Sequence, residues 1–149
     1  MKLRSSLQLT LAVLKPDLMT NPARLQSVKE KILKEKFWIL RWSILHWQRK
    51  DAELFYQEHR GKFFIQRLTS FMSRAKLSHP DSIRGMYGVT DTRNATHGSD
   101  SVKTAEKEMK FFFPDFDSTN WMKNHADEFE NGKVAFDEQL QIHKVELKK

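Results

Sequence analysis

Apolar and polar residues alternate near the start of the chain. Apolar residues occupy every second position from Leu7 to Val13, and the polar residues Gln8 and Thr10 lie between them. This period of two is that of a β-strand with one buried face. The segment becomes almost wholly apolar at its end, as a central strand does. The pattern therefore predicts a strand over residues 7–14.

The apolar residues that follow recur at the helical spacing of three and four. Asn21 is a favourable N-cap, and Pro22 suits the first turn of a helix because the missing N–H has no partner there. The apolar residues of one face are Leu25, Val28, Ile32 and Leu33. We therefore predict an amphipathic helix over residues 22–36.

Shorter patterns predict the elements in the middle of the chain. Residues 37–47 are rich in aromatic and β-branched side chains, which favours a second strand. Short helices are predicted from Asp51 to Arg60 and from Phe63 to Met72. Residues 82–90 predict a further strand, which contains Arg84.

Helical periodicity returns at residues 102–113, and the predicted helix ends there because Pro114 cannot continue it. Beyond Trp121 the pattern is weak, and Asn131-Gly132 predicts a turn within a polar tail. Strands interspersed with helices in this order indicate an α+β domain with an antiparallel sheet.

Composition narrows the class of protein. A chain of 149 residues is large enough for one domain with a hydrophobic core, and 39% of its residues are hydrophobic. The absence of cysteine excludes disulfides and zinc–thiolate sites. No apolar run reaches the length of a membrane span. Residues 1–6 form a basic extension too short for a cleavable signal, so we expect no secretion.

The net charge of +7 favours polyanionic partners such as nucleotides, nucleic acids or acidic lipid surfaces. Many of the basic residues, however, alternate with acids, as in residues 29–36. Such runs are typical of a solvated helix face. Net charge alone therefore supports nucleic-acid binding only weakly.

The candidate chemistry lies in residues 92–101, TRNATHGSDS. His97 is followed by glycine, and a predicted helix begins shortly after it. An imidazole in this position has little steric cover and stands near the positive end of a helix dipole, where phosphates are favoured. A histidine there could accept a phosphoryl group and pass it on. The alternative is that His97 is a loop residue packed against a helix start, since short motifs have many false positives.

Residues 92–101 resemble the active-site segment N-x-x-H-G-S-D-S of the nucleoside diphosphate kinase family. Further motifs of that family follow in the same order along the chain, and the resemblance spans residues 7–121. They are Lys15-Pro16-Asp17 after the first strand, Phe55-Tyr56, Phe63-Phe64, Ser82-Ile83-Arg84-Gly85 and Glu106-Lys107-Glu108. The spellings TDTRN and FFPDF are closest to the divergent, mitochondrial-type branch conventionally numbered six.

The resemblance implies a ferredoxin-like antiparallel sheet with helices on its faces. It assigns residues 7–122 to the kinase-like domain and residues 123–149 to a polar C-terminal tail. It also reveals a missing segment, because only residues 73–79 separate Met72 from Pro80. Family members have a third strand, a helix and a long loop there. We therefore expect a sheet that lacks one central strand, whose neighbours must close up or leave backbone groups unpaired.

The activity that the resemblance implies is a ping-pong transfer. A nucleoside triphosphate such as ATP phosphorylates His97, and phospho-His97 then phosphorylates a nucleoside diphosphate. This reaction requires mainly positioning and charge neutralisation from the protein. The sequence contains no carboxylate cluster for a dedicated metal site, so Mg²⁺ is expected to arrive bound to the nucleotide.

The resemblance also implies the nucleotide-binding residues. Lys15 and Arg84 supply positive charge, and Arg84 can hold a phosphate through two N–H donors. Asn94 is placed at the ribose hydroxyl, Tyr56 near the histidine and Phe63 as a stacking surface for the base. Simpler interpretations stay open: Phe63 and Tyr56 as packing residues, Lys15 as an edge-strand charge and Arg84 as a cross-strand partner.

The last pair of implied roles concerns Glu108 and Ser99. Glu108, supported by Ser99, accepts a hydrogen from the far ring nitrogen of His97, which fixes the tautomer and leaves the other nitrogen able to attack. The simpler alternative is that Glu108 is a helix-surface acid four residues after Thr104.

Two further functions compete with kinase activity. The missing segment favours a catalytically weak or inactive family member that acts as a protein-interaction or regulatory partner. His79 and Asp81 replace the lysine and glycine usual around Pro80, in a loop that helps subunits associate, so a homo-oligomer is an open question. Nucleic-acid binding rests on net charge alone. By resemblance the protein is mitochondrial, and cytoplasmic location is the alternative.

Overall fold

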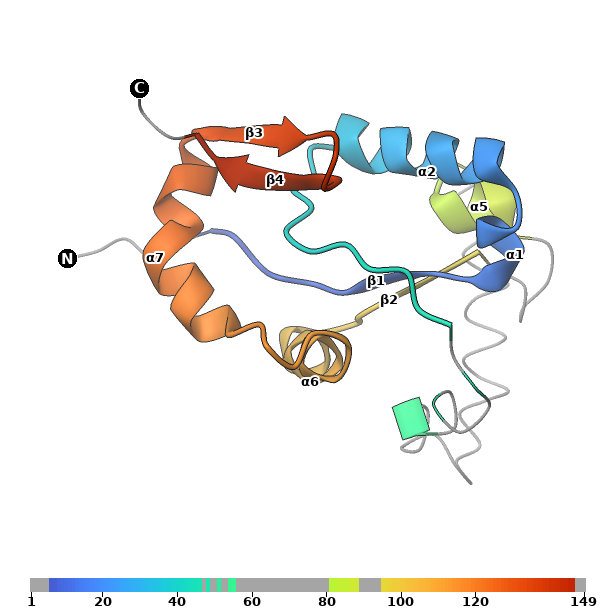
Figure 1. Ribbon diagram of the computed structural model, residues 1–149, viewed down its shortest axis with the longest axis horizontal. Helices are drawn as coiled ribbons and strands as arrows, with labels where there is room; N and C mark the ends of the chain where they lie inside the picture. The colour runs from blue at the N-terminus through green and yellow to red at the C-terminus, as the bar shows by residue number, and fades with distance from the viewer. Residues whose placement is uncertain are drawn as a thin grey trace. The chain divides into compact units, whose positions relative to one another are not determined.

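The computed structural model describes residues 6–46, 48, 51, 54–55, 81–88 and 95–146. The chain divides into two compact units. Unit 1 consists of Met1–Leu11, Phe37–His46 and Ser99–Lys149, and unit 2 consists of Ala12–Lys36 and Trp47–Gly98. Helices and antiparallel strands occur together, which confirms the predicted α+β class (Figure 1).

Unit 2 contains two strands and three helices with defined bounds, and the described residues Asp51, Leu54 and Phe55 are also helical. The elements with defined bounds are β1 (Ala12–Leu14), α1 (Pro16–Met19), α2 (Pro22–Lys34), α5 (Ile83–Tyr87) and β2 (Thr96–Gly98). β1 and β2 are antiparallel, and Val13 pairs with His97. The strand predicted over residues 7–14 is therefore right in place but too long. Alternation shows which side chains are buried, as Leu11 is, but does not show where backbone pairing stops.

Helix α2 begins and ends close to the predicted positions. The Asn21 side chain accepts a hydrogen bond from the backbone N–H of Arg24, with 3.1 Å between Oδ1 and N. Val28 is fully buried and forms a core with Leu18 and Ala95. Partly buried residues pack against this core from β1, α2 and α5; they are Leu14, Ile32, Ile83 and Tyr87.

The strand predicted over residues 82–90 is wrong for its described part, because Ile83–Tyr87 form helix α5. The Ser82 hydroxyl accepts a hydrogen bond from the backbone N–H of Gly85 at 3.0 Å, which caps the helix. Ile83 and Tyr87 stand four residues apart and both pack against the core. This helical spacing, together with the serine cap, outweighs the β-propensity of the segment.

Unit 1 contains α6 (Val102–Phe112), α7 (Ser118–Glu130), β3 (Val134–Asp137) and β4 (Ile142–Val145). Helix α6 confirms the prediction: the Ser101 hydroxyl caps Thr104 N–H at 3.1 Å, and Ala105 and Met109 are buried. Pro114 follows its end.

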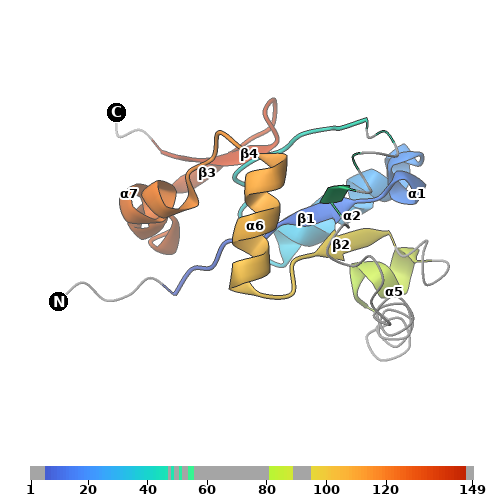
Figure 2. The same cartoon turned by 90° about the horizontal axis from the view of Figure 1, so that it is seen from below.

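Residues 118–146 are more structured than the weak pattern predicted. Asp117 caps α7 by accepting from the Asn120 N–H at 2.8 Å. Gly132, with φ at 66°, makes the predicted turn after α7 and leads into an antiparallel hairpin of β3 and β4. Figure 2 shows α7 beside this hairpin. The predicted domain division stays a prediction; its boundary after residue 122 falls within α7.

The strand predicted over residues 37–47 is wrong for its described part, since residues 37–46 form no regular element. The Ile39 carbonyl accepts from the His143 N–H at 2.6 Å, and the Ile39 N–H donates to His143 Nδ1 at 2.9 Å. In the second hydrogen bond the acceptor is a side-chain nitrogen, whereas in a β-ladder it would be a backbone carbonyl. β-propensity describes what a segment can do, whereas a ladder also requires a neighbouring strand in register.

The remaining predictions fall where the structure gives little or no description. The helix predicted over residues 63–72 lies outside the described residues. Of the helix predicted over residues 51–60, only Asp51, Leu54 and Phe55 are described, and all three are helical. Residues 73–79, at the predicted gap, also lie outside the described residues. Within the described part of the chain, no helix is both long and apolar enough to cross a lipid bilayer.

Candidate functional site

His97 stands at the centre of the candidate site, in the middle of strand β2. It is half-buried and pairs with Val13 of β1. The Phe55 ring packs edge-on against the imidazole, with 5.6 Å between ring centroids and 83° between the planes. His97 is therefore a strand residue and not the loop residue of the alternative interpretation.

The backbone leading into His97 is held by Lys15, the N-cap of α1, and by residues of α1 and α5. The Lys15 N–H donates to the Ala95 carbonyl at 2.8 Å, and the Asp17 carboxylate accepts from the Ala95 N–H at 3.3 Å. The Arg84 Nε donates to the Thr96 carbonyl at 3.1 Å. The guanidinium of Arg84 is thus anchored to the residue immediately before His97.

Lys15 and Arg84 lie within electrostatic reach of each other. Partial burial lowers the pKa of the Lys15 ammonium, the positive charge of Arg84 lowers it further, and Asp17 opposes both. Two partly desolvated cations that repel each other are stabilised by a polyanion between or beside them. The pair can therefore bind an anion such as a phosphate group.

The second group of predicted site residues lies in unit 1. The Ser99 hydroxyl donates to the Glu108 carboxylate, with 2.5 Å between Oγ and Oε2. The Ser99 N–H also donates to the Leu11 carbonyl at 3.1 Å. Glu108 is half-buried, so the simple alternative of a solvated helix-surface acid does not describe it.

The structure thus places two sets of predicted residues: Lys15, Arg84 and His97 in unit 2, and Ser99 with Glu108 in unit 1. Arg84 lies on helix α5 and is not the cross-strand partner that a strand would have made it. Three predicted binding residues lie outside the described residues; they are Tyr56, Phe63 and Asn94.

Sequence reasoning gave no role to Asp17 or Phe55, which the structure places against the His97 segment. Both stand inside motifs of the family pattern, Lys15-Pro16-Asp17 and Phe55-Tyr56. Asp17 stands two residues after Lys15, and Phe55 immediately precedes Tyr56. This closeness to residues with implied roles is the signal that identifies them.

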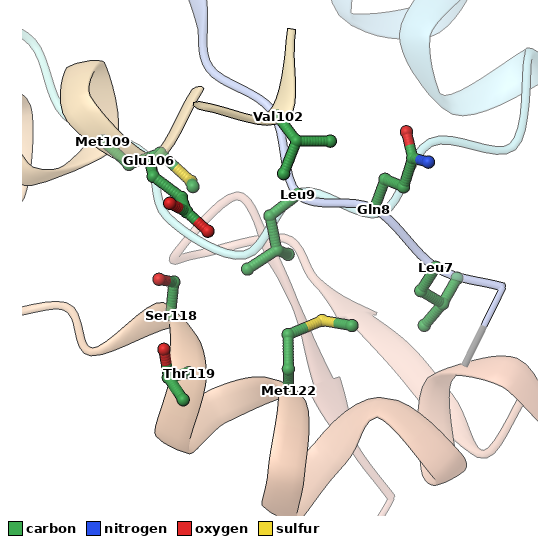
Figure 3. Close-up of a pocket in the computed structure, with 9 residues that line it drawn as sticks. All are labelled: Leu7, Gln8, Leu9, Val102, Glu106, Met109, Ser118, Thr119 and Met122. Atoms are coloured by element: carbon green, nitrogen blue, oxygen red, sulfur yellow. The ribbon is translucent and has the colours of Figure 1, made fainter. Parts of the chain in front are cut away.

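A separate pocket of about 300 Å³ lies within unit 1, and no predicted site residue lines it. Leu9 lies between Val102 and Met122 in a mainly apolar lining, to which Glu106 contributes a carboxylate (Figure 3). In the part of the chain that the structure describes, no three His, Asp or Glu side chains gather as a metal site would require.

Comparison with known proteins defines the family. The family model described as nucleoside diphosphate kinase matches residues 8–79 and 73–118. Nucleoside diphosphate kinase 6 of Danio rerio is 42% identical over 173 aligned positions, which cover 97% of this chain and 98% of the relative. The protein of the same name from Homo sapiens is 39% identical over 168 positions, covering 94% and 90%.

A solved structure agrees with these sequences. The crystal structure of the Aquifex aeolicus nucleoside diphosphate kinase matches with a TM-score of 0.60 and 26% identity, covering 71% of this chain and 94% of that one. The fold is therefore that of a nucleotide-binding class of phosphotransferase. The chain belongs to the nucleoside diphosphate kinase family, and its similarity to relatives numbered six confirms the predicted branch.

The comparisons also support the predicted missing segment. The two matches to the family model overlap at residues 73–79, so the match breaks where the sequence analysis places the gap. The alignment with the Danio rerio relative has 173 positions, 24 more than the 149 residues of this chain. At least 24 of its positions are therefore gaps in this chain.

Proposed function

We propose that the protein is a nucleoside diphosphate kinase that works by a ping-pong mechanism through phospho-His97. The observation that carries this proposal is the Arg84–Thr96 hydrogen bond, which ties a phosphate-binding type of side chain to the strand that holds His97. Lys15, whose pKa responds to the charge of Arg84, adds a second cation at the same place. Family membership supplies the reaction class.

The proposed reaction has two halves. In the first, a ring nitrogen of His97 attacks the γ-phosphorus of a nucleoside triphosphate; the N–P bond forms, the bridging P–O bond breaks and the diphosphate leaves. In the second, a terminal oxygen of another diphosphate attacks the same phosphorus, and the N–P bond breaks to restore the imidazole. Mg²⁺ enters as part of the nucleotide substrate and neutralises charge on its phosphates.

Lys15 and Arg84 bind the phosphates and neutralise the charge that moves between the leaving and attacking oxygens. Glu108 holds the imidazole in the tautomer that leaves the attacking nitrogen unprotonated, and Ser99 holds Glu108. The 2.5 Å bond between Ser99 and Glu108 supports this pairing.

The family pattern suggests the remaining roles, which complete the proposed site. Asn94 binds the ribose, Tyr56 places its hydroxyl near the histidine and Phe63 stacks on the base. A mitochondrial location is proposed on the same ground, by similarity to the branch numbered six.

Labelling tests the proposal directly. The protein is incubated with [γ-³²P]ATP and Mg²⁺ without an acceptor, and we expect acid-labile, base-stable label that ADP or GDP then removes as triphosphate. His97→Ala should take up none and should keep the wild-type melting temperature. His46→Ala, which removes an exposed histidine, is the matched control. Label in His97→Ala at the wild-type level would place the nucleophile elsewhere.

The break in the family match at residues 73–79 favours one second candidate, a weak or inactive family member that acts through a protein partner. In the family, the segment missing here carries an arginine and a threonine that contact the nucleotide phosphates. A cooperatively folded wild-type chain that takes up no label, at ATP concentrations up to the millimolar range, would support this candidate over the kinase.

A further inference from the structure

Ala95 is held by hydrogen bonds on both sides of its backbone. Its carbonyl accepts from the Lys15 N–H at 2.8 Å, and its N–H donates to the Asp17 carboxylate at 3.3 Å. Asp17 and Ala95 are 78 residues apart in the chain. The Ala95 side chain is 1% exposed and packs in the core with Leu18 and Val28. This residue is therefore fixed by hydrogen bonds and by packing together.

The backbone of Ala95 adopts a conformation that a non-glycine residue rarely occupies. Its φ is 67°, in the left-handed region, where the Cβ atom approaches the backbone too closely. Such a conformation persists only where the surroundings determine it, and it is common at functional sites. Two residues later the chain reaches His97 in β2. The direction in which the strand carries the imidazole thus depends on this bend.

We propose that Asp17 is a positioning residue: by holding the left-handed backbone of Ala95, it fixes His97 relative to Lys15 and Arg84. This inference rests on the proposed function, because it assigns Asp17 to the phosphorylation of His97. Asp17 contacts neither the nucleotide nor the reacting atoms in this proposal. It acts through the Ala95 peptide.

A second effect of the same carboxylate supports the inference. Asp17 opposes the burial and the Arg84 charge that lower the pKa of Lys15. Asp17 is therefore linked to the catalytic strand through Ala95 and to a phosphate-binding side chain through its charge. The competing explanation is that Asp17 serves only as an acid in the first turn of α1, where the helix dipole favours it. That role would affect folding alone.

Two substitutions separate these explanations. Asp17→Asn removes the charge but keeps an oxygen that can accept from the Ala95 N–H, whereas Asp17→Ala removes both. We expect Asp17→Ala to slow single-turnover labelling of His97 by about 10- to 100-fold, and Asp17→Asn by less than about tenfold. The affinity for ATP should change less than the rate. Asp127→Asn, an exposed helix aspartate in α7, is the matched control.

Ala95→Gly tests whether Asp17 acts through the bend. Glycine occupies positive φ readily, so the segment needs less support from Asp17. We expect Asp17→Ala to cost several-fold less in labelling rate in the Ala95→Gly background than in the wild type. If Asp17→Ala slows labelling by the same factor in the Ala95→Gly background as in the wild type, Asp17 does not act through Ala95 and the inference is overturned.

A measurement independent of activity separates failure of this inference from failure of the proposed function. In NMR spectra of the full chain, Asp17→Ala should shift the Ala95 amide and the His97 ring signals, while Asp17→Asn should shift them less. The Lys15 pKa should fall in both variants. Unchanged Ala95 and His97 signals in Asp17→Ala would refute the positioning role, whether or not the wild type takes up label. A wild type that takes up no label would refute the proposed function alone.

Discussion

The Ser99 hydroxyl donates a hydrogen bond to the Glu108 carboxylate, with 2.5 Å between Oγ and Oε2. Ser99 follows His97 by two residues, and Glu108 lies in the second turn of α6. The serine is itself held, because its N–H donates to the Leu11 carbonyl. We propose that this hydrogen bond fixes the carboxylate for the role that the family pattern gives to Glu108, the orientation of the His97 imidazole.

Glu108→Gln is expected to slow phosphorylation of the histidine by one to two orders of magnitude. The amide removes the charge that favours the correct tautomer, and loss of such supporting partners typically costs about 10- to 100-fold. Ser99→Ala should cost less, because the carboxylate stays. Rapid-quench single-turnover labelling measures both. Glu106→Gln, an exposed acid on the same helix, should match the wild type. An unchanged rate in Glu108→Gln would make Glu108 a structural residue.

Arg84→Lys is expected to weaken ATP binding by about tenfold, equivalent to about 1.4 kcal/mol. Lysine keeps the charge but lacks the Nε donor that bonds the Thr96 carbonyl and the planar fork that holds a phosphate. Isothermal titration calorimetry with MgATP measures the change. Arg41→Lys is the control, since Arg41 is an exposed partner of Asp115. Equal affinities for Arg84→Lys and wild type would show that charge alone matters at this position.

The stability of the protein should fall as the pH falls below about 6.5. Partial burial lowers the pKa of the His143 imidazole, whose Nδ1 accepts the Ile39 N–H. The unfolded chain, with an ordinary pKa of about 6.5, takes up the proton first, so the unfolded state gains stability as the pH decreases through that value. Above it, this contribution is constant.

Urea unfolding between pH 8 and pH 5 measures this dependence. His143→Gln, which cannot titrate, should lose less stability than the wild type over this range. His125→Gln removes an exposed histidine from α7 and serves as the control. If His143→Gln and wild type lose stability in parallel, His143 does not contribute to the pH dependence.

The elements with strong local signals were predictable from the sequence. Helices α2 and α6 begin within a residue of the predicted positions because Asn21 and Ser101 cap them, and Pro114 marks the end of α6. Residues 83–87 form a helix although the sequence predicts a strand, because Ile83 and Tyr87 also suit β-structure. The four-residue spacing of Ile83 and Tyr87 favours a helix because both side chains pack against a core formed by residues distant in sequence.

The site shows the same division. His97, Lys15 and Arg84 belong to short sequence motifs, so they can be identified from the sequence alone. The contact between Asp17 and Ala95 cannot be predicted from the sequence, because it joins residues 78 positions apart. The left-handed backbone cannot be predicted either, because that conformation is expected at glycine and here occurs at alanine. The strand predicted over residues 37–47 was wrong since strand formation depends on a neighbour that local pattern does not supply.

Restoring the missing segment should raise both stability and nucleotide affinity. A sheet without a central strand leaves backbone groups unpaired, and each buried unpaired group costs about 1–3 kcal/mol against a total stability of about 5–15 kcal/mol. We expect a chimera that carries a relative's segment between Met72 and Pro80 to melt cooperatively at a higher temperature and to bind ATP more tightly. Calorimetry measures both.

The matched control for the chimera is an insertion of the same length made of glycine and serine. A wild-type chain that already melts cooperatively at high temperature and binds ATP as tightly as the chimera would contradict this prediction. It would show that the sheet closes without the segment.

Mapping the phosphoryl group tests the central claim most directly. After incubation with MgATP, the wild-type chain is digested at alkaline pH, and mass spectrometry locates the phosphate. The account predicts phosphohistidine at His97 alone, lost on addition of a nucleoside diphosphate with formation of an equal amount of triphosphate. Phosphate on another residue, or phosphate on His97 that no diphosphate removes, would contradict it.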